Sequence, residues 1–223
     1  MTTHIQALKK KIILDLCGGT GAWSLPYKEA GYDVRNITLP DYDVRIYKLP
    51  KEPIYGILSA PPCTMFSFAR TKAKTPRDLR EGMEIVIACL KLIWETQYRI
   101  KNDQQKYPPL KFWALENPFY GMLQWFLGKP VLTFQPYDFG HNYQKKTAIW
   151  GYFNTDEIYA QMRPNKLSIE QKKLASKNSQ PLPKFNYMKS KTIAPEWFGK
   201  LDRQARRAIT PRGFAEAFYL ANK

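Results

Sequence analysis

The chain has 223 residues, 44% of them hydrophobic, and its 35 Lys and Arg against 19 Asp and Glu give a net charge of +16. This length suits one α/β domain with a small addition, and the positive charge favours a polyanionic partner, nucleic acid ahead of a membrane surface. No apolar stretch of about 18 residues predicts a membrane span, and the first residues lack the apolar core of a secretion signal.

Cysteine and histidine are too few and too scattered to suggest a metal site. Cys17, Cys63 and Cys89 form no Cys-x-x-Cys pair, and His4 and His141 are the only histidines. We therefore expect no disulfide, no zinc site and no His-dependent catalytic triad. This cysteine content fits a reducing cytoplasm.

The first elements predict the opening of a doubly wound α/β fold. Residues 12–16 form an apolar run that predicts a buried strand, and the glycine-rich segment Cys17-Gly-Gly-Thr-Gly-Ala-Trp-Ser24 follows it. A helix over 25–30 and a second strand over 32–37 come next. Strand, glycine turn, helix and strand in this order are typical of domains that bind nucleotide cofactors.

The glycine turn favours a cofactor without a pyrophosphate. Gly19 and Gly21 supply part of a dinucleotide fingerprint, but the third glycine position holds Ser24. Glycines let the backbone approach a ligand closely, and S-adenosylmethionine needs less of a phosphate cradle than a dinucleotide does. The alternative is a tight turn that serves packing alone.

A reactive thiol is predicted at the end of the next strand. The apolar run 54–60 predicts a buried parallel strand, which Pro61 and Pro62 end. Cys63 follows at the carboxyl end of that strand, where open α/β sheets place ligands and chemistry. Cys63 is therefore a candidate nucleophile, and the alternative is a small buried hydrophobe.

A long amphipathic helix and further strands complete the predicted domain. The helix starts with Thr75 as N-cap and Pro76 at its first position, and it runs to about Tyr98. Its predicted apolar face comprises Met83, Val86, Ile87, Leu90, Ile93 and Trp94. Strands are predicted over 111–115, 131–135 and 147–151, a poorly regular Lys-rich insert over 154–200, and a helix over 203–222.

Three segments, in this order, resemble motifs of the C5-cytosine DNA methyltransferases. They are Leu14-Asp-Leu-Cys-Gly-Gly-Thr-Gly21, Ala60-Pro-Pro-Cys-Thr-Met-Phe-Ser67 and Ala114-Leu-Glu-Asn-Pro118. They are similar to the cofactor turn, the Pro-Cys nucleophile loop and the Glu-Asn pair of that family. Arg207-Ala-Ile-Thr-Pro-Arg-Gly-Phe-Ala215 looks like its closing motif. The similarity covers about residues 11–151 and 203–222.

The resemblance implies a Rossmann-like methyltransferase fold with S-adenosylmethionine as cofactor. Methyl transfer to C5 of a flipped cytosine would pass through a covalent Cys63 adduct, with Glu116 as the acid at ring N3. Residues 1–151 would form the catalytic domain, 152–202 a small target-recognition region, and 203–223 the helix that completes the catalytic domain. Because this target-recognition region is unusually small, the chain looks like a compact, phage-encoded member of the family. Such a member would recognise a short base sequence or have relaxed specificity.

The resemblance also assigns site residues. The catalytic residues are Cys63, Glu116 and Lys145. The cofactor residues are Asp15, Cys17, Gly18, Gly19, Thr20, Gly21, Trp23, Asp43, Val44 and Pro61. The nucleic-acid residues are Ser67, Arg70, Lys72, Lys74, Asn117 and Lys146. The basic loop 66–80 resembles the family's mobile loop that closes over DNA, and its alternative is a solvated basic loop.

The sequence departs from the family pattern at three places. Where the family has Gln-x-Arg-x-Arg, this chain has Tyr143-Gln-Lys-Lys-Thr147, so that Lys145 or Lys146 would take the place of an arginine without its bidentate fork. The acid expected near Thr38 and Leu39 to bind the cofactor ribose is missing, so that either Asp41 replaces it or the contact is lost. Arg207-Ala208 replaces the Gly-Asn of the closing motif.

Other activities stay open at this point. The same fold and nucleophile would serve RNA, single-stranded DNA, a nucleotide or an altered one-carbon donor, and an inactive nucleic-acid-binding module is a further alternative. We expect a monomer in the cytoplasm of a bacterium or a phage-infected cell. Its expected partner is duplex DNA, with no membrane and no metal.

Overall fold

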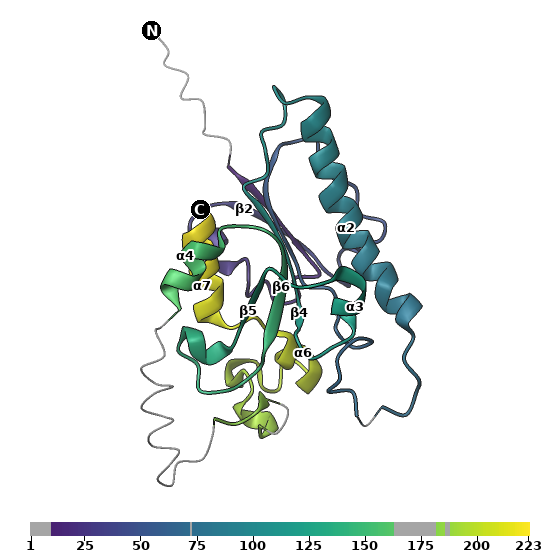
Figure 1. Cartoon of the computed structure of the whole chain (residues 1–223), viewed down its shortest axis with the longest axis vertical. Coiled ribbons are helices and arrows are strands. Elements are labelled where there is room, and N and C mark those ends of the chain that lie inside the picture. Colours follow the sequence, from purple (N-terminus) through teal and green to yellow (C-terminus); the bar gives the residue numbers. More distant parts are fainter. Residues whose placement is uncertain (1–9, 72, 163–181, 186–187) are drawn as a thin grey trace.

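The computed structural model describes residues 10–71, 73–162, 182–185 and 188–223 and shows one mixed sheet between two layers of helices (Figure 1). The six strands lie in the order β2-β1-β3-β4-β6-β5. Their bounds are β1 Ile12–Leu16, β2 Asp33–Ile37, β3 Ile54–Ser59, β4 Phe112–Pro118, β5 Leu132–Phe134 and β6 Thr147–Tyr152. Strands β2, β1, β3 and β4 are parallel, whereas β6 is antiparallel to both β4 and β5. The predicted α/β class is confirmed, and the sheet is compatible with a Rossmann-like fold.

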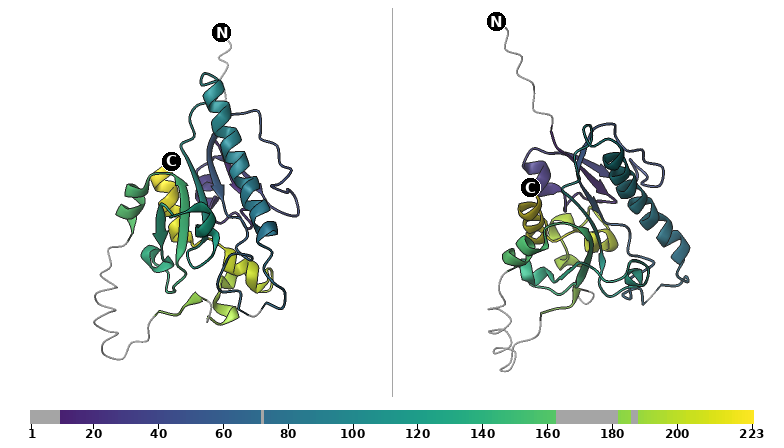
Figure 2. Two further views of the ribbon diagram at one scale, coloured as in Figure 1. Left: turned by 45° about the vertical axis from the view of Figure 1, so that its right-hand side comes forward. Right: turned by 45° about the horizontal axis from the view of Figure 1, so that its top comes forward.

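Helices cover both faces of the sheet, as the two views of Figure 2 show. On one face α1 (Leu25–Glu29), α4 (Thr155–Gln161) and α7 (Arg212–Asn222) share a core with β1, β3 and β4. On the other face lie α2 (Leu79–Asn102) and α3 (Leu123–Leu127). The remaining elements are α6 (Arg203–Ala208) and the 3-10 helices η1 (Pro136–Phe139), η3 (Ser190–Thr192) and η4 (Pro195–Trp197).

The strands are apolar on both sides because both sides are covered. In β1, Ile13 packs with α1 and α7, whereas its neighbours Ile12 and Leu14 pack with α2. Alternate strand side chains point to opposite faces, so a strand between two helical layers reads as a continuous hydrophobic run. This explains why the apolar runs at 12–16 and 54–60 identified strands correctly.

The predicted start and apolar face of the long helix were both partly wrong. The N-cap is Asp78, not Thr75, and its carboxylate accepts the backbone N–H of Glu81 at 2.9 Å. Ile87 and Trp94 are 53% and 58% exposed. The buried stripe runs instead through residues 86, 89, 93 and 96 at helical spacing, so residues 87 and 94 lie about 100° from it.

The predicted single helix over 203–222 is two helices. α6 ends at Ala208 and α7 starts at Arg212, with Pro211 as its N-cap. Proline lacks a backbone N–H and pushes the preceding residue out of the helical region, so the chain turns there. In the predicted insert, α4 packs on α7 through the buried Ile158, and residues 163–181 lie outside the described part of the chain.

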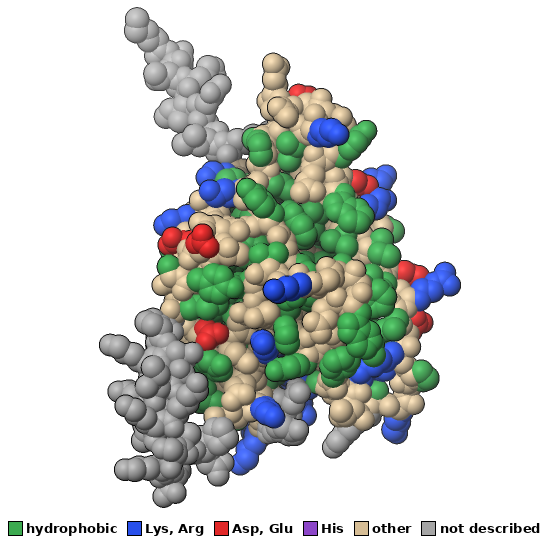
Figure 3. Space-filling view, in the orientation of Figure 1, with side chains coloured by type: hydrophobic (Ala, Val, Ile, Leu, Met, Phe, Trp, Pro, Cys, Tyr) green, Lys and Arg blue, Asp and Glu red, His purple; other side chains and the backbone are tan. Residues whose placement is uncertain are grey.

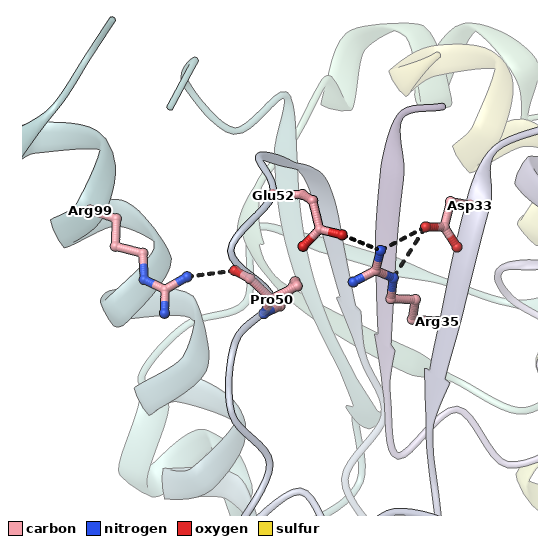
Figure 4. Close-up of polar contacts among 5 residues, drawn as sticks. All are labelled: Asp33, Arg35, Pro50, Glu52 and Arg99. Carbon is pink, nitrogen blue, oxygen red and sulfur yellow. Dashed lines mark hydrogen bonds and ion pairs between the residues drawn. The ribbon is translucent and has the colours of Figure 1, made fainter. Parts of the chain in front are cut away.

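An ion pair and a hydrogen bond hold the loop before β3 in place at the amino ends of the strands (Figure 4). The Arg35 guanidinium bridges Asp33 at 2.9 Å and Glu52 at 3.2 Å. Arg99 of α2 donates to the Pro50 carbonyl at 2.7 Å. The partly exposed ion pairs of Arg35 contribute little stability each. The pair with Glu52 joins the loop to β2, and the Arg99 hydrogen bond joins it to α2.

Candidate functional site

The carboxyl ends of β1, β3 and β4 meet at one edge of the sheet. From β1 the chain moves outward to β2, and β3 then lies on the other side of β1. Such a reversal of strand order opens a crevice at the carboxyl ends, where open α/β sheets bind ligands. The Ala60 N–H donates to the Leu16 carbonyl at 2.9 Å, which joins the segment after β3 to the end of β1. The glycine turn and the Cys63 loop are therefore neighbours.

The glycine turn has a backbone that side chains would disturb. Gly19 and Gly21 have φ of +55° and +71°, which favour glycine, and even Cys17 has φ of 57°. A Cβ on Gly18 would collide with the Asp15 carboxyl group and would come within 2.6 Å of the Asn36 amide oxygen. A Cβ on Gly19 would meet nothing within 4 Å, so this part of the backbone is open to a ligand.

Beneath the turn lie two buried oxygen atoms that have no partner within the described residues. The Ser24 hydroxyl donates to one Asp15 carboxylate oxygen at 2.5 Å, but the other oxygen is unpartnered. Asn36 donates its amide N–H to the Gly19 carbonyl at 2.9 Å, and its own oxygen is unpartnered. Burial raises the pKa of Asp15 to about 6, against the opposing effect of the Ser24 hydrogen bond. Ionised Asp15 would favour a cationic or hydrogen-bond-donating ligand here.

The predicted cofactor residues separate into two sets. Asp15 and the residues of the turn, including the partly buried Thr20, lie together. Trp23 and Val44 are buried in the core instead, and the Trp23 ring packs edge-on against Phe218 at 5.4 Å. Asp43 is bound by the Arg45 guanidinium, which holds the pKa of the Asp43 carboxyl at about 2. Their contact with a cofactor stays a prediction.

Hydrogen bonds within the loop, from β4 and from Arg77 hold the backbone that carries Cys63. The Cys63 carbonyl accepts the backbone N–H of Ser67 at 2.8 Å, which closes a tight turn. The buried Asn117 side chain of β4 donates to the carbonyl of Pro61 at 3.0 Å. Arg77 donates to the carbonyl of Met65 and to that of Ser67, each at 2.9 Å. The thiol is thus presented on a fixed backbone between β3 and β4.

A carboxyl group and two cations act electrostatically on the pKa of the thiol. Burial raises the pKa of Cys63, and so does the charge of Glu116, whereas Lys145 and Arg207 oppose the increase. Burial also raises the pKa of Glu116, and Lys145 opposes it. The backbone agrees with this, because Asn117, next to Glu116, binds the Pro61 carbonyl, and Thr147 pairs with Pro118 at the end of β4. Cys63, Glu116 and Lys145 thus belong to segments that lie at the same edge of the sheet. A thiol beside a carboxylic acid can pair nucleophilic attack with proton donation.

Helix α6 supplies two residues near the site that are not among the predicted site residues. The Lys145 ammonium donates to the Arg207 carbonyl at 3.0 Å, and the Arg207 side chain acts electrostatically on Cys63. Gln204 donates to the Thr64 hydroxyl at 3.0 Å across 140 residues of sequence. The only sequence signal that pointed to Arg207 is its place at the start of the predicted closing motif. No sequence signal pointed to Gln204.

The predicted nucleic-acid residues differ in their exposure and in their contacts. Asn117 is buried, and Arg70 donates to the Thr75 hydroxyl at 2.9 Å. Lys146 lies over the Phe119 ring, with its nitrogen 3.9 Å from the ring centre. Ser67 forms a β-bridge with Gly121 and Lys74 is exposed, whereas Lys72 lies outside the described residues. Their contact with nucleic acid stays a prediction.

Neither the protein-family models nor the curated proteins contain a match to this chain. Among the described residues, no group of three or more His, Cys, Asp or Glu side chains could hold a metal ion. No helix in the described ranges is long and apolar enough to cross a membrane.

Proposed function

We propose that this protein is an S-adenosylmethionine-dependent methyltransferase that acts on C5 of cytosine in DNA. The observation that carries the proposal is that the segments of Cys63, Glu116 and Lys145 lie together at the carboxyl edge of the sheet, beside an open glycine turn.

The turn has the properties that the cofactor requires. Asp15 and Asn36 would hold it, because their unpartnered oxygens accept hydrogen bonds and ionised Asp15 attracts positive charge. Gly19 would let the backbone approach it closely. When bound, S-adenosylmethionine supplies an electrophilic methyl group on a sulfonium.

Cys63 and Glu116 have complementary tasks in the proposed reaction. The Cys63 thiolate adds to C6 of cytosine, and Glu116, whose raised pKa favours the protonated form, donates a hydrogen bond or proton to ring N3. The ring becomes an enamine that is nucleophilic at C5. C5 would take the methyl group from the sulfonium, which would be left as a neutral thioether. Water would then take the C5 proton, the C5–C6 double bond would form again as the bond from sulfur to C6 breaks, and Cys63 would leave as the thiolate. Lys145 and Arg207 favour the thiolate that starts the sequence.

The test is incubation with isotope-labelled S-adenosylmethionine and unmodified DNA, followed by mass spectrometry of the nucleosides. Duplex DNA, single-stranded DNA and RNA are assayed separately. We expect labelled 5-methylcytosine with the natural protein and none with Cys63→Ala, while both bind the cofactor equally in calorimetry. Equal turnover by Cys63→Ala would exclude covalent catalysis. Cofactor binding with no methylated base on any substrate would refute the proposed activity.

A further inference from the structure

Four aromatic side chains lie exposed on the surface next to the Cys63 loop. Phe68, Tyr120, Trp125 and Phe126 are 43%, 61%, 67% and 49% exposed. We call them the aromatic surface. The rings of Phe68 and Trp125 are 6.0 Å apart, and the Phe68 N–H donates to the Tyr120 carbonyl at 3.1 Å. Figure 3 shows hydrophobic side chains gathered over α3, with Lys and Arg side chains at their border.

The aromatic surface is joined to the candidate catalytic loop through the backbone. Ser67, which donates to the Cys63 carbonyl at 2.8 Å, forms a β-bridge with Gly121. The Met122 N–H donates to the Phe66 carbonyl at 3.0 Å, and the buried Phe66 ring lies beneath Phe126 at 6.4 Å between ring centres. A ligand on this surface would therefore lie beside the Cys63 loop.

The charges around the aromatic surface indicate what it binds. The two segments that carry it, 61–77 and 117–135, contain no Asp or Glu. They contain Arg70, Lys74, Arg77 and Lys129, together with Lys72, which lies outside the described residues. Grouped exposed aromatic rings mark an interaction site, and basic residues without acidic ones in the same segments favour a polyanion. Aromatic faces with basic side chains are the combination that single-stranded nucleic acids bind, through base stacking and phosphate contacts.

We propose that the aromatic surface is a stacking platform for unpaired nucleobases, so that the chain binds its nucleic-acid substrate as a single strand or a locally opened duplex. Bases inside a duplex present only their edges, and stacking on Trp125 or Phe68 requires a base face that is free. This inference specifies the substrate of the proposed function, but the binding assay that tests it involves no methyl transfer.

The experiment compares two labelled strands of about 16 nucleotides, a length that such sites cover. One is oligo(dT), and the other is an abasic strand with the same phosphates and no bases. Fluorescence anisotropy at one fixed, low salt concentration gives the affinity of each. Trp125→Ala should bind oligo(dT) about fivefold or more weakly, because stacking contributes that much per base, with no change on the abasic strand. Trp125→Phe should keep most of the affinity.

Trp94→Ala is the matched control, since Trp94 is also an exposed tryptophan, 58% accessible, but lies on α2. It should bind both strands as the natural protein does. Equal loss of affinity for both strands upon Trp125→Ala, or no loss for either, would overturn the platform. So would sedimentation data in which Trp125→Ala dissociates a dimer while oligo(dT) affinity stays unchanged. If the platform holds but no 5-methylcytosine forms, the proposed reaction fails and the binding site stands.

Discussion

The Asp15 carboxyl group should make this protein less stable as the pH rises from acid to neutral. Its pKa is raised from 3.8 to about 6 in the folded chain, because the group is buried, and the Ser24 hydrogen bond offsets only part of this increase. Between these two values the folded state holds a proton that the unfolded state has lost. The contribution of Asp15 to stability is therefore fully present below the pKa that this group has in the unfolded chain. It is lost as the pH rises through the pKa that the group has in the folded chain.

The size of this effect follows from the shift in pKa. One pKa unit corresponds to about 1.4 kcal/mol, so the full loss is about 3 kcal/mol, and about 2 kcal/mol of it falls between about pH 4.5 and 7.5. Asp15→Asn removes the ionisable group. We therefore expect the free energy of unfolding of Asp15→Asn, relative to that of the natural protein, to increase by about 2 kcal/mol over this interval.

The assay is urea unfolding, with linear extrapolation, at several pH values across that interval. Ser24→Ala is a control of opposite sign: it removes the hydrogen bond that lowers the pKa of Asp15, so its loss of stability with pH should be steeper. Asp41→Asn, at an exposed carboxylate, controls for removal of one negative charge. A difference between Asp15→Asn and the natural protein that does not change with pH would refute the reasoning.

Three further results are expected. Asn117→Ala should cost about 1–3 kcal/mol in urea unfolding, because it leaves a carbonyl of the Cys63 loop unpaired; an unchanged midpoint would show that the bond is dispensable. Phe218→Ala should cost about 3–5 kcal/mol, since its ring is fully buried, whereas Leu220→Ala, 47% exposed on the same helix, should change stability by under about 0.5 kcal/mol; similar losses would contradict the packing. Turnover should rise as the pH increases above neutrality, because the raised pKa of Cys63 keeps most of the thiol protonated at neutral pH. A flat pH–rate profile would exclude attack by this thiol.

The sequence alone could place the candidate nucleophile because the signals around it are local. An apolar run bounded by prolines predicts a buried strand and where it ends, and Cys63 comes directly after that end. The same reasoning located Glu116 on the neighbouring strand, since parallel strands end at a common edge. The glycine turn was recognisable because its backbone angles favour glycine at Gly19 and Gly21.

The tertiary structure decided which side chains surround these residues. The contacts of Arg207 and Gln204 with the site join segments far apart in the chain, and no local pattern encodes such a distance. It also decided that Trp94 faces outward on α2, because an amphipathic pattern with apolar residues on two sides does not say which side meets the sheet. Sequence therefore determined the elements and their ends, through short-range backbone preference. Tertiary packing determined how deeply Cys63 is buried and which charged side chains lie near it. Both depend on residues that come together only when the sheet and its helices assemble.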